Sequence, residues 1–382
     1  MAYYFIYPEK DATIYSHPNR VGLNTGRDEI LELLEEKSSV GETYFPSRFL
    51  IKFKSTEIKD ILENKLSGIS TWQSNLEIFS AEHKSLHTDH IIEAYAVSDN
   101  WDEGTGRFRN NPTSSNGVTW QMRTDTGSAA SAIWATSSFA TGITGSSHNF
   151  TNISGGGSWY TGSNFIAENS FFNEDNLDLN FDVTQIVKYF SASFYQGALY
   201  PTGIKNEGFI IKKPKITEDN PSASFGELQY FSTDTHTIYP PKLTFKWDDS
   251  IYSHSGTTLS KGDIFLSLYN NKGEFQRKSK QRFRLTTRKR YPDRTFVSSS
   301  NYLDTQYLPA TSYYSVRDAE TDEVIIPFDT SYTKLSADGE GMYFDLFMEG
   351  LQPERYYKLM FRSDNNDGIQ IFDEDYIFKV VR

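Results

Sequence analysis

The densest group of chemically capable side chains lies in residues 99–121, DNWDEGTGRFRNNPTSSNGVTWQ. It contains two tryptophans, two arginines and the adjacent carboxylates Asp102 and Glu103. Paired carboxylates flanking a glycosidic bond are the machinery of glycoside hydrolysis. Neighbouring residues of a strand point to opposite faces, so these two acids would need a partner from elsewhere to act. We therefore expect one of them to accept backbone N–H bonds in a tight turn, and Trp101 to fill the interior.

Three histidines, His83, His87 and His90, lie close together beside Asp89. Imidazole nitrogens at this spacing could gather a metal ion on one helical turn. The flanking segments LEIFS and IIEAYAVS have the pattern of strands, however, which favours a polar hairpin loop. A zinc site would also need hydrogen bonds that orient its ligands. We predict no metal and no cofactor for the chain.

Residues 363–374, SDNNDGIQIFDE, partly follow the calcium-binding EF-hand loop. Asn365, Asp367, Gly368 and Glu374 stand at ligand or turn positions. A serine replaces the usual leading aspartate, and no helical pattern flanks the segment. Asn-Asp-Gly between two strand patterns is typical of a hairpin turn, which is the structure we expect, with calcium binding as the alternative.

Residues 277–294 form a basic segment with nine Lys or Arg and one Asp, in a chain of net charge −12. The alternation Arg282-Phe283-Arg284-Leu285 places charges on one strand face and apolar side chains on the other. The segment is either a solvated strand face or a docking face for an acidic partner or another copy of this acidic chain. Nucleic acid is the least favoured partner, because Phe283 points away from the charged face. The candidate contact residues are Arg277, Lys278, Lys280, Arg282 and Arg284.

Residues 127–165 are rich in Gly, Ser and Thr, a composition typical of disorder. Large aromatic side chains are spaced through them, which indicates a long ordered excursion and hence a candidate for partner contact. In the alternative interpretation, the rings stack on sugars. Exposure of Trp134 and Trp159 in one groove would favour sugar binding, and burial in the core would exclude it. The aromatics are Trp134, Phe139, Phe150, Trp159 and Tyr160.

Composition favours an all-β chain of two domains. The length of 382 residues exceeds that of one typical domain. Aromatic residues are abundant at 15%, and short aromatic or β-branched runs bounded by Gly, Pro, Asn or Ser recur throughout. We predict a jelly-roll β-sandwich over residues 1–248, a linker over 249–261 and an immunoglobulin-like β-sandwich over 262–382, with about seven strands in the last.

Two short helices interrupt this pattern. Residues 55–65 begin with a Ser/Thr cap and carry apolar Ile58, Ile61 and Leu62. Residues 182–192 begin at a capping aspartate, Asp182. One face of the second helix is apolar, formed by Val183, Ile186, Val187 and Phe190.

Charge and cysteine content limit which partners and which cellular compartment are compatible with this sequence. The acidic balance disfavours a general attraction to nucleic acid or to an anionic membrane. The absence of cysteine favours assembly in a reducing cytosol. We find no signal-peptide pattern and no apolar run of about 18 residues, so we expect a soluble protein made in the cytoplasm.

The order of motifs over residues 8–247 resembles the DNRLRE-type domain, a jelly-roll sandwich related to carbohydrate-binding modules. The matching elements are DATIYS, NTGRDEILEL, RFLIKFK, WDEG, VTW, DVT and PPKL. The chain departs from that family in two long insertions and in Asp234, where the family has glutamate. Arg107 and Arg109 lie in the first insertion, residues 107–116, and are candidate contact residues.

The C-terminal region resembles fibronectin type III and related domains. Leu351, Pro353 and Tyr357 follow the L-x-P-x-x-x-Y spacing of a tyrosine corner, in which a buried hydroxyl bonds to the backbone just upstream. Stretches such as SSFATGITGSS and GGGSWYTGSN resemble structural proteins of tailed-bacteriophage virions. We therefore expect a non-enzymatic particle component of the tail, neck, fibre attachment or head decoration, located in the virion, that contacts other virion proteins and its own copies. The alternative is an adhesion module that binds host-surface glycans.

Overall fold

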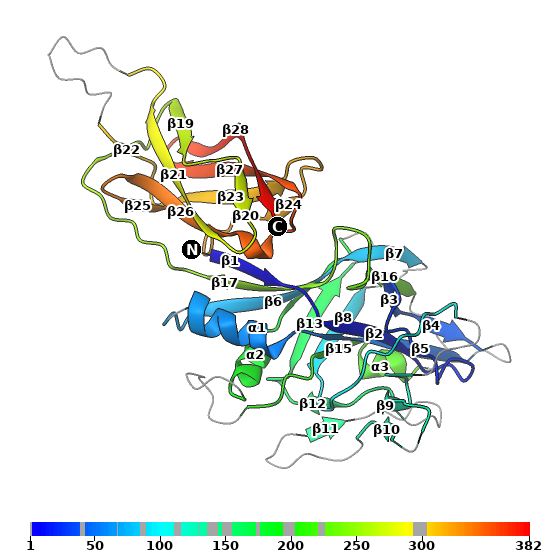
Figure 1. Cartoon of the computed structure of the whole chain (residues 1–382). Coiled ribbons are helices and arrows are strands. Elements are labelled where there is room, and N and C mark those ends of the chain that lie inside the picture. Colours follow the sequence, from blue (N-terminus) through cyan, green and yellow to red (C-terminus); the bar gives the residue numbers. More distant parts are fainter. Residues whose placement is uncertain are drawn as a thin grey trace, which may run out of the picture. The chain divides into compact units, whose positions relative to one another are not determined.

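The computed structural model describes residues 2–38, 43–66, 68–84, 89–110, 116–128, 130–135, 144–146, 155–172, 176–193, 203–220, 226–292 and 304–382 (Figure 1). Strands account for 47% of the described residues and helices for 8%, and the sheets are mostly antiparallel. The predicted all-β class is confirmed. The jelly-roll and immunoglobulin-like topologies stay predictions.

The chain divides into two compact units. One contains Ile6–Ser67 and Ser74–Thr244, and we call it the larger unit. The other contains Met1–Phe5, Gly68–Gln73 and Phe245–Arg382, and we call it the smaller unit. A sheet of order β1-β17-β6-β14 contains β1 (Ala2–Ile6), β17 (Lys242–Trp247), β6 (Trp72–Ile78) and β14 (Leu179–Asp182).

The larger unit is built on a six-stranded sheet of order β13-β8-β15-β5-β2, with β4 paired to β5. A three-stranded sheet has the order β3-β16-β7, and β9 pairs with β10 and β11 with β12. The strands are β2 (Lys10–Tyr15), β3 (Ile30–Leu33), β4 (Glu35–Lys37), β5 (Tyr44–Lys52), β7 (Ser80–Lys84), β8 (His90–Ala96), β9 (Met122–Thr124), β10 (Ala132–Ile133), β11 (Thr144–Ser146), β12 (Trp159–Thr161), β13 (Ile166–Phe171), β15 (Phe209–Lys212) and β16 (Glu227–Phe231).

The core of the larger unit is rich in tryptophan. Trp101, Trp120, Trp134 and Trp159 pack in one cluster with apolar residues of the six-stranded sheet, such as Leu50. The strands predicted from RFLIKFK, IIEAYAVS and GFIIKK are β5, β8 and β15 of that sheet. Their apolar runs are buried because both faces of these central strands are covered.

Both predicted helices are present. The first is α1 (Ser55–Asp60), which continues as a π-helical turn, Ile61–Lys65, and buries Ile58, Ile61 and Leu62. The predicted Ser/Thr cap is wrong: the N-cap is Lys54, and the Ser55 hydroxyl instead accepts a hydrogen bond from Asn206.

The second helix, α2 (Thr184–Ser191), buries all four predicted apolar side chains. The predicted cap at Asp182 is wrong by one residue, because the N-cap is Val183; the Asp182 carboxylate nevertheless accepts the N–H of Thr184, the first helical residue. A third, single-turn helix is α3 (Lys215–Glu218), which the sequence pattern did not predict.

The smaller unit contains two sheets that pack face to face. One has the order β18-β22-β21-β26-β25, with β19 paired to β21, and the other has the order β20-β28-β27-β23-β24. Phe344 of the first sheet contacts Tyr314 and Phe361 of the second, at ring-centroid distances of 4.4 and 5.8 Å. The strands are β18 (Thr257–Thr258), β19 (Ile264–Tyr269), β20 (Glu274–Gln276), β21 (Lys280–Lys289), β22 (Gln306–Tyr307), β23 (Ser312–Asp318), β24 (Val324–Ile326), β25 (Ser336–Asp338), β26 (Gly341–Phe347), β27 (Tyr356–Asn365) and β28 (Gly368–Val381).

The tyrosine corner is confirmed. Tyr357 is buried, and its hydroxyl donates to the backbone oxygen of Gln352 at 2.9 Å. The described part of residues 262–382 holds ten strands where about seven were predicted. The additional strands, β20, β22 and β25, have only two or three residues each, too short to show an alternating pattern.

Candidate functional site

The stretch that contains Asp102 and Glu103 is a structural frame. Trp101 is fully buried, and its indole N–H donates to the backbone oxygen of Glu207 at 2.9 Å. The backbone of Asp102 pairs with Arg123 and Val118. Glu103 accepts a long hydrogen bond of 3.4 Å from the N–H of Asp11, and Asp102 is exposed. Trp101 is buried as expected, but the Glu103 carboxylate accepts its N–H bond from β2, 92 residues away, and not within a tight turn of its own segment.

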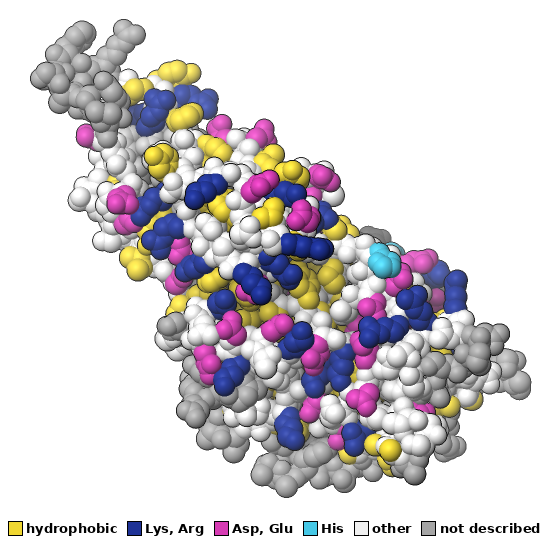
Figure 2. Space-filling view, viewed as in Figure 1, with side chains coloured by type: hydrophobic (Ala, Val, Ile, Leu, Met, Phe, Trp, Pro, Cys, Tyr) yellow, Lys and Arg dark blue, Asp and Glu magenta, His cyan; other side chains and the backbone are white. Residues whose placement is uncertain are grey.

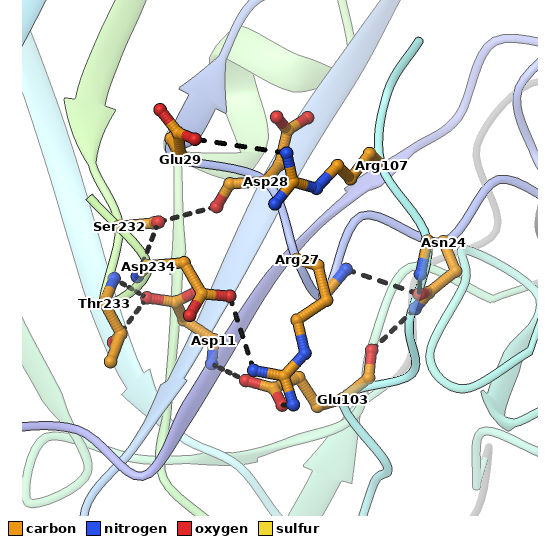
Figure 3. Close-up of polar contacts among 12 residues, drawn as sticks. Asp11, Asn24, Arg27, Asp28, Glu29, Glu103, Arg107, Ser232, Thr233 and Asp234 are labelled. Carbon is orange, nitrogen blue, oxygen red and sulfur yellow. Dashed lines mark hydrogen bonds and ion pairs between the residues drawn. The ribbon is translucent and has the colours of Figure 1, made fainter. Parts of the chain in front are cut away.

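Asn24 fixes this frame to the rest of the larger unit (Figure 3). Its amide nitrogen donates to the backbone oxygens of Glu103 at 2.7 Å and Val118 at 2.8 Å. Its amide oxygen accepts the N–H groups of Gly106 at 2.8 Å and Gly26 at 3.3 Å. One side chain thus uses both donors and its acceptor on backbone groups from two separate segments.

Glycines allow these segments to approach. A Cβ atom added to Gly26 would lie 2.0 Å from the Glu103 oxygen, and one on Gly106 would lie 2.2 Å from the Asn24 oxygen. Gly104 has a φ of +82°, a conformation that other residues adopt at a cost. These positions can hold only glycine without moving the backbone of their neighbours.

Three carboxylates from distant parts of the sequence gather near Arg27 (Figure 3). Asp11 lies on β2, Glu103 in the frame, and Asp234 after β16. One oxygen of Asp11 accepts the N–H and the hydroxyl of Thr233 at 2.6 and 2.7 Å. Arg27 lies 3.3 Å from Glu103 and 3.5 Å from Asp234 and so bridges the other two acids.

Burial dominates the electrostatics of this cluster. It raises the pKa of Asp11 to about 7, with Glu103 and Asp234 adding to the rise and the two bonds from Thr233 opposing it. Burial also raises the pKa of Glu103, against the attraction of Arg27. A carboxyl with a pKa near 7 is suited to proton transfer. The Asp11 side chain is enclosed, however, and its contacts join β2 to the segment after β16.

A second cluster of buried charges lies on the six-stranded sheet. Arg48 of β5 donates from Nε and Nη2 to the Glu218 carboxylate at 2.9 and 2.6 Å, and from Nη1 to the Gly156 oxygen at 2.5 Å. Lys212 lies 3.2 Å from Glu93 and 3.6 Å from Glu218. All four charged groups are largely removed from water, so their pairing offsets a large desolvation cost.

Lys213 and Glu35 extend this cluster at a separation of 3.7 Å. Burial raises the pKa of Glu35 to about 7 and lowers that of Lys213, while the attraction between the two opposes both shifts. The Arg48 guanidinium also lies 4.8 Å from the ring centroid of Trp120 and 5.2 Å from that of Trp159. The cluster therefore connects α3, β4 and the aromatic core.

The aromatic candidates for sugar stacking are buried. Trp134, Trp159 and Tyr160 are 1%, 6% and 9% exposed. Trp134 donates its indole N–H to the Thr119 oxygen at 3.1 Å. Burial is the outcome that excludes stacking of sugars on Trp134 and Trp159, because their rings already pack in the core cluster. Phe139 and Phe150 lie outside the described residues.

Arg107 and Arg109 are exposed. Arg107 lies 4.0 Å from Glu29, a weak surface ion pair, and its backbone oxygen accepts the N–H of Asn110 in a turn. Phe108 between them packs on Tyr15. The following residues of the insertion, 111–115, lie outside the described residues.

The basic strand has the predicted alternation, but its central charges are paired. Phe283 and Leu285 are buried while Arg282 and Arg284 point outward. Lys280 and Arg282 both bind Asp345, at 3.1 and 2.8 Å.

Arg284 completes the pairing along this strand. It makes two bonds of 2.9 Å to Asp338 and lies 3.0 Å from Glu340. Arg277 and Lys278 are exposed and make no ion pair with any residue that the structure describes. The positive charge still available for a partner therefore lies at the ends of β21, not along its middle.

The two candidate metal-binding segments form other structures. His83 lies on β7 and His90 at the start of β8, whereas His87 lies outside the described residues. In the part of the chain that the structure describes, no three His, Asp or Glu side chains could hold a metal ion together. Asn365 pairs with Gly368 at the turn between β27 and β28, so the predicted hairpin is confirmed.

Sequence reasoning missed the Arg48–Glu218 pair. Arg48 lies inside the apolar run SRFLIKF, and a charge within a central strand was the available signal. Nothing near Glu218 indicated that its carboxylate would be the partner.

A search of protein-family models and of curated proteins found no match to this chain. Among the described residues, no helix is long and apolar enough to cross a membrane.

Proposed function

We propose that this protein is a non-enzymatic structural component of a bacteriophage particle, acting through protein–protein contacts. The sequence resemblance to tailed-phage virion proteins supplies the setting. Tail, neck, fibre attachment and head decoration are the positions in the particle that we consider. A role in the particle implies contact with other virion proteins and with copies of the chain itself.

The exposed positive charge at both ends of β21 is the observation that supports this role best. Arg277, Lys278, Arg288 and Arg290 are exposed and make no ion pair with other described residues, although the net charge is −12. Figure 2 shows basic and acidic side chains interspersed over the face in view. Basic groups left without ion-pair partners in an acidic chain favour contact with an acidic protein surface, including that of another copy.

The polar groups that could have done chemistry act instead as connections within the fold. Asp11, Glu103 and Asp234 join segments of the larger unit through Thr233 and Arg27. Asp11 and Glu103 stand in DATIYS and WDEG, two of the elements that carry the DNRLRE-type resemblance, which supports a framework role for those motifs. The alternative of glycan binding loses its proposed stacking residues, since Trp134 and Trp159 are buried.

Mass spectrometry of purified particles tests the proposal. We expect peptides of this chain in particles of the phage that encodes it, at a level comparable with other structural proteins. Absence from particles in which the other structural proteins are detected would contradict the proposal. Binding of the purified chain to a glycan array would favour the alternative.

A further inference from the structure

The last strand of the smaller unit has one long unpaired edge. β28 has 14 residues and pairs with β27 along most of its length (Figure 1). On its second side, β20 pairs only with Lys379, Val380 and Val381. Among the described residues, no strand continues this pairing along Gly368–Asp375, and the Asn271 side chain donates to the backbone oxygen of Ile377 at 2.9 Å. An open strand edge is a template for pairing with another chain.

The start of this edge is apolar and exposed. Ile369 and Ile371 are 64% and 55% exposed, and they project from the same face of β28. The residues opposite them on the neighbouring strand, β27, are Asp364 and Arg362, which already form an ion pair with each other at 2.7 Å. Proteins usually protect such edges with charges or bulges, and this segment carries two isoleucines instead.

Acidic residues follow the isoleucines and favour a partner with positive charge. Asp373, Glu374 and Asp375 are exposed where the pairing with β27 is irregular. Lys358 lies 2.7 Å from Asp373 and 3.2 Å from Asp375, so one cation is shared by two of the three carboxylates. This surplus of negative charge favours Lys or Arg on the strand that binds here.

The same charges disfavour a second copy of β28 as the occupant. Consider an antiparallel pairing in which Ile369 lies opposite Ile371 of the copy. In this register the numbers of any two opposing residues add up to 740. Asp373 would then oppose the copy's Asp367. Like charges directly opposite in a sheet are destabilising.

We propose that the open edge of β28, Gly368–Asp375, binds an extended segment of a partner protein that presents two apolar residues followed by Lys or Arg on one strand face. The partner strand lies in line with β20 and adds to the sheet by main-chain hydrogen bonds. On the face that carries Ile369, Ile371 and Asp373, its apolar residues cover the two isoleucines and its basic residues face Asp373 and Asp375. This surface is distinct from the basic strand β21, and its test requires no phage particle.

The experiment uses the full chain and two fluorescein-labelled ten-residue peptides with Thr at every second position. The residues between are two Val followed by Lys in the Val-Lys peptide, and two Val followed by Glu in the Val-Glu peptide. Fluorescence anisotropy measures binding, and hydrogen exchange with mass spectrometry locates it. The test variant is Ile369→Lys/Ile371→Lys. The control, Ile133→Lys/Ile216→Lys, adds the same charge at two exposed isoleucines outside this sheet.

We expect the Val-Lys peptide to bind, to protect the β28 amides from exchange, and to lose at least tenfold in affinity in the test variant but less than twofold in the control. Equal losses in both variants, or no protection of β28, would show nonspecific attraction and overturn the proposal. So would equal binding of the Val-Glu peptide or failure of the Val-Lys peptide to bind. A wild-type dimer that the test variant alone dissociates would identify a second copy as the occupant and likewise overturn it.

Discussion

The Arg48 guanidinium and the Glu218 carboxylate form a two-bonded ion pair whose side chains are almost completely buried. Arg48 lies on β5 and Glu218 at the end of α3, 170 residues further along the chain. The pair therefore ties a single-turn helix with little stability of its own to the central sheet. It also lies against Trp120, which belongs to the same core as the frame.

Removing one member of this pair should destabilise the fold strongly. We expect Arg48→Met or Glu218→Leu to lower the free energy of unfolding by about 3–5 kcal/mol, because each leaves a buried charge poorly compensated. The double variant should cost much less than the sum. Urea unfolding of all four proteins measures this coupling.

The exposed pair Lys59–Glu63 provides the control. Lys59→Met should cost less than about 1 kcal/mol, since exposed pairs contribute little. Additive effects of Arg48→Met and Glu218→Leu would contradict the buried-pair interpretation.

Among the polar residues of the frame, Asn24 should be the one whose substitution lowers the free energy of unfolding most. Asn24→Ala leaves the backbone oxygens of Glu103 and Val118 and the N–H of Gly106 without their partner. Buried groups without partners cost about 1–3 kcal/mol each, so we expect a loss of several kcal/mol in urea unfolding. Asn110→Ala, at an exposed position of the same region, should change stability little. Equal stability of the two variants would refute the role assigned to Asn24.

Asp11 should make stability depend on pH. Burial raises its pKa from 3.8 to about 7 in the folded chain. Between those values the folded state holds a proton that the unfolded state releases, so ionisation of Asp11 lowers stability as pH rises, by about 1.4 kcal/mol per pH unit. Asp11→Asn removes this dependence and keeps an acceptor for Thr233.

Urea unfolding of wild type and Asp11→Asn from pH 4 to pH 8 measures the effect. The stability of the variant relative to wild type should increase from about pH 4 to about pH 7 and then level off. A difference that stays constant over this range would show that Asp11 has an ordinary pKa in the folded chain.

The tyrosine corner offers a prediction with an adjacent control. Tyr357→Phe removes the hydroxyl that donates to Gln352 and leaves the ring in place, which should cost about 1 kcal/mol. Tyr356→Phe alters an exposed residue and should have a smaller effect. Similar midpoints of thermal unfolding for the two variants would argue against a stabilising corner.

Local patterns predicted the elements of this fold well. The apolar stripe of α2 and the alternation around Phe283 depend only on the periodicity of a helix and a strand, so they could be identified from the sequence. Tyr357 could be placed because its contact lies five residues away in the chain.

Contacts between distant segments could not be predicted in this way. The bonds of Asn24 to Val118 and of Arg48 to Glu218 depend on how loops cross the sheet, which no local pattern records. The tryptophans show the same limit. Trp134 and Trp159 lie in a polar, glycine-rich composition that resembles an exposed loop, yet they pack in the core.

Quantitative mass spectrometry across a density gradient of purified phage tests the central claim most directly. If the chain is a structural component, its peptides should follow the major particle protein from fraction to fraction at a fixed ratio, before and after a high-salt wash. Peptides that remain in the soluble fractions, with none at the density of intact particles, would contradict a structural role in the virion.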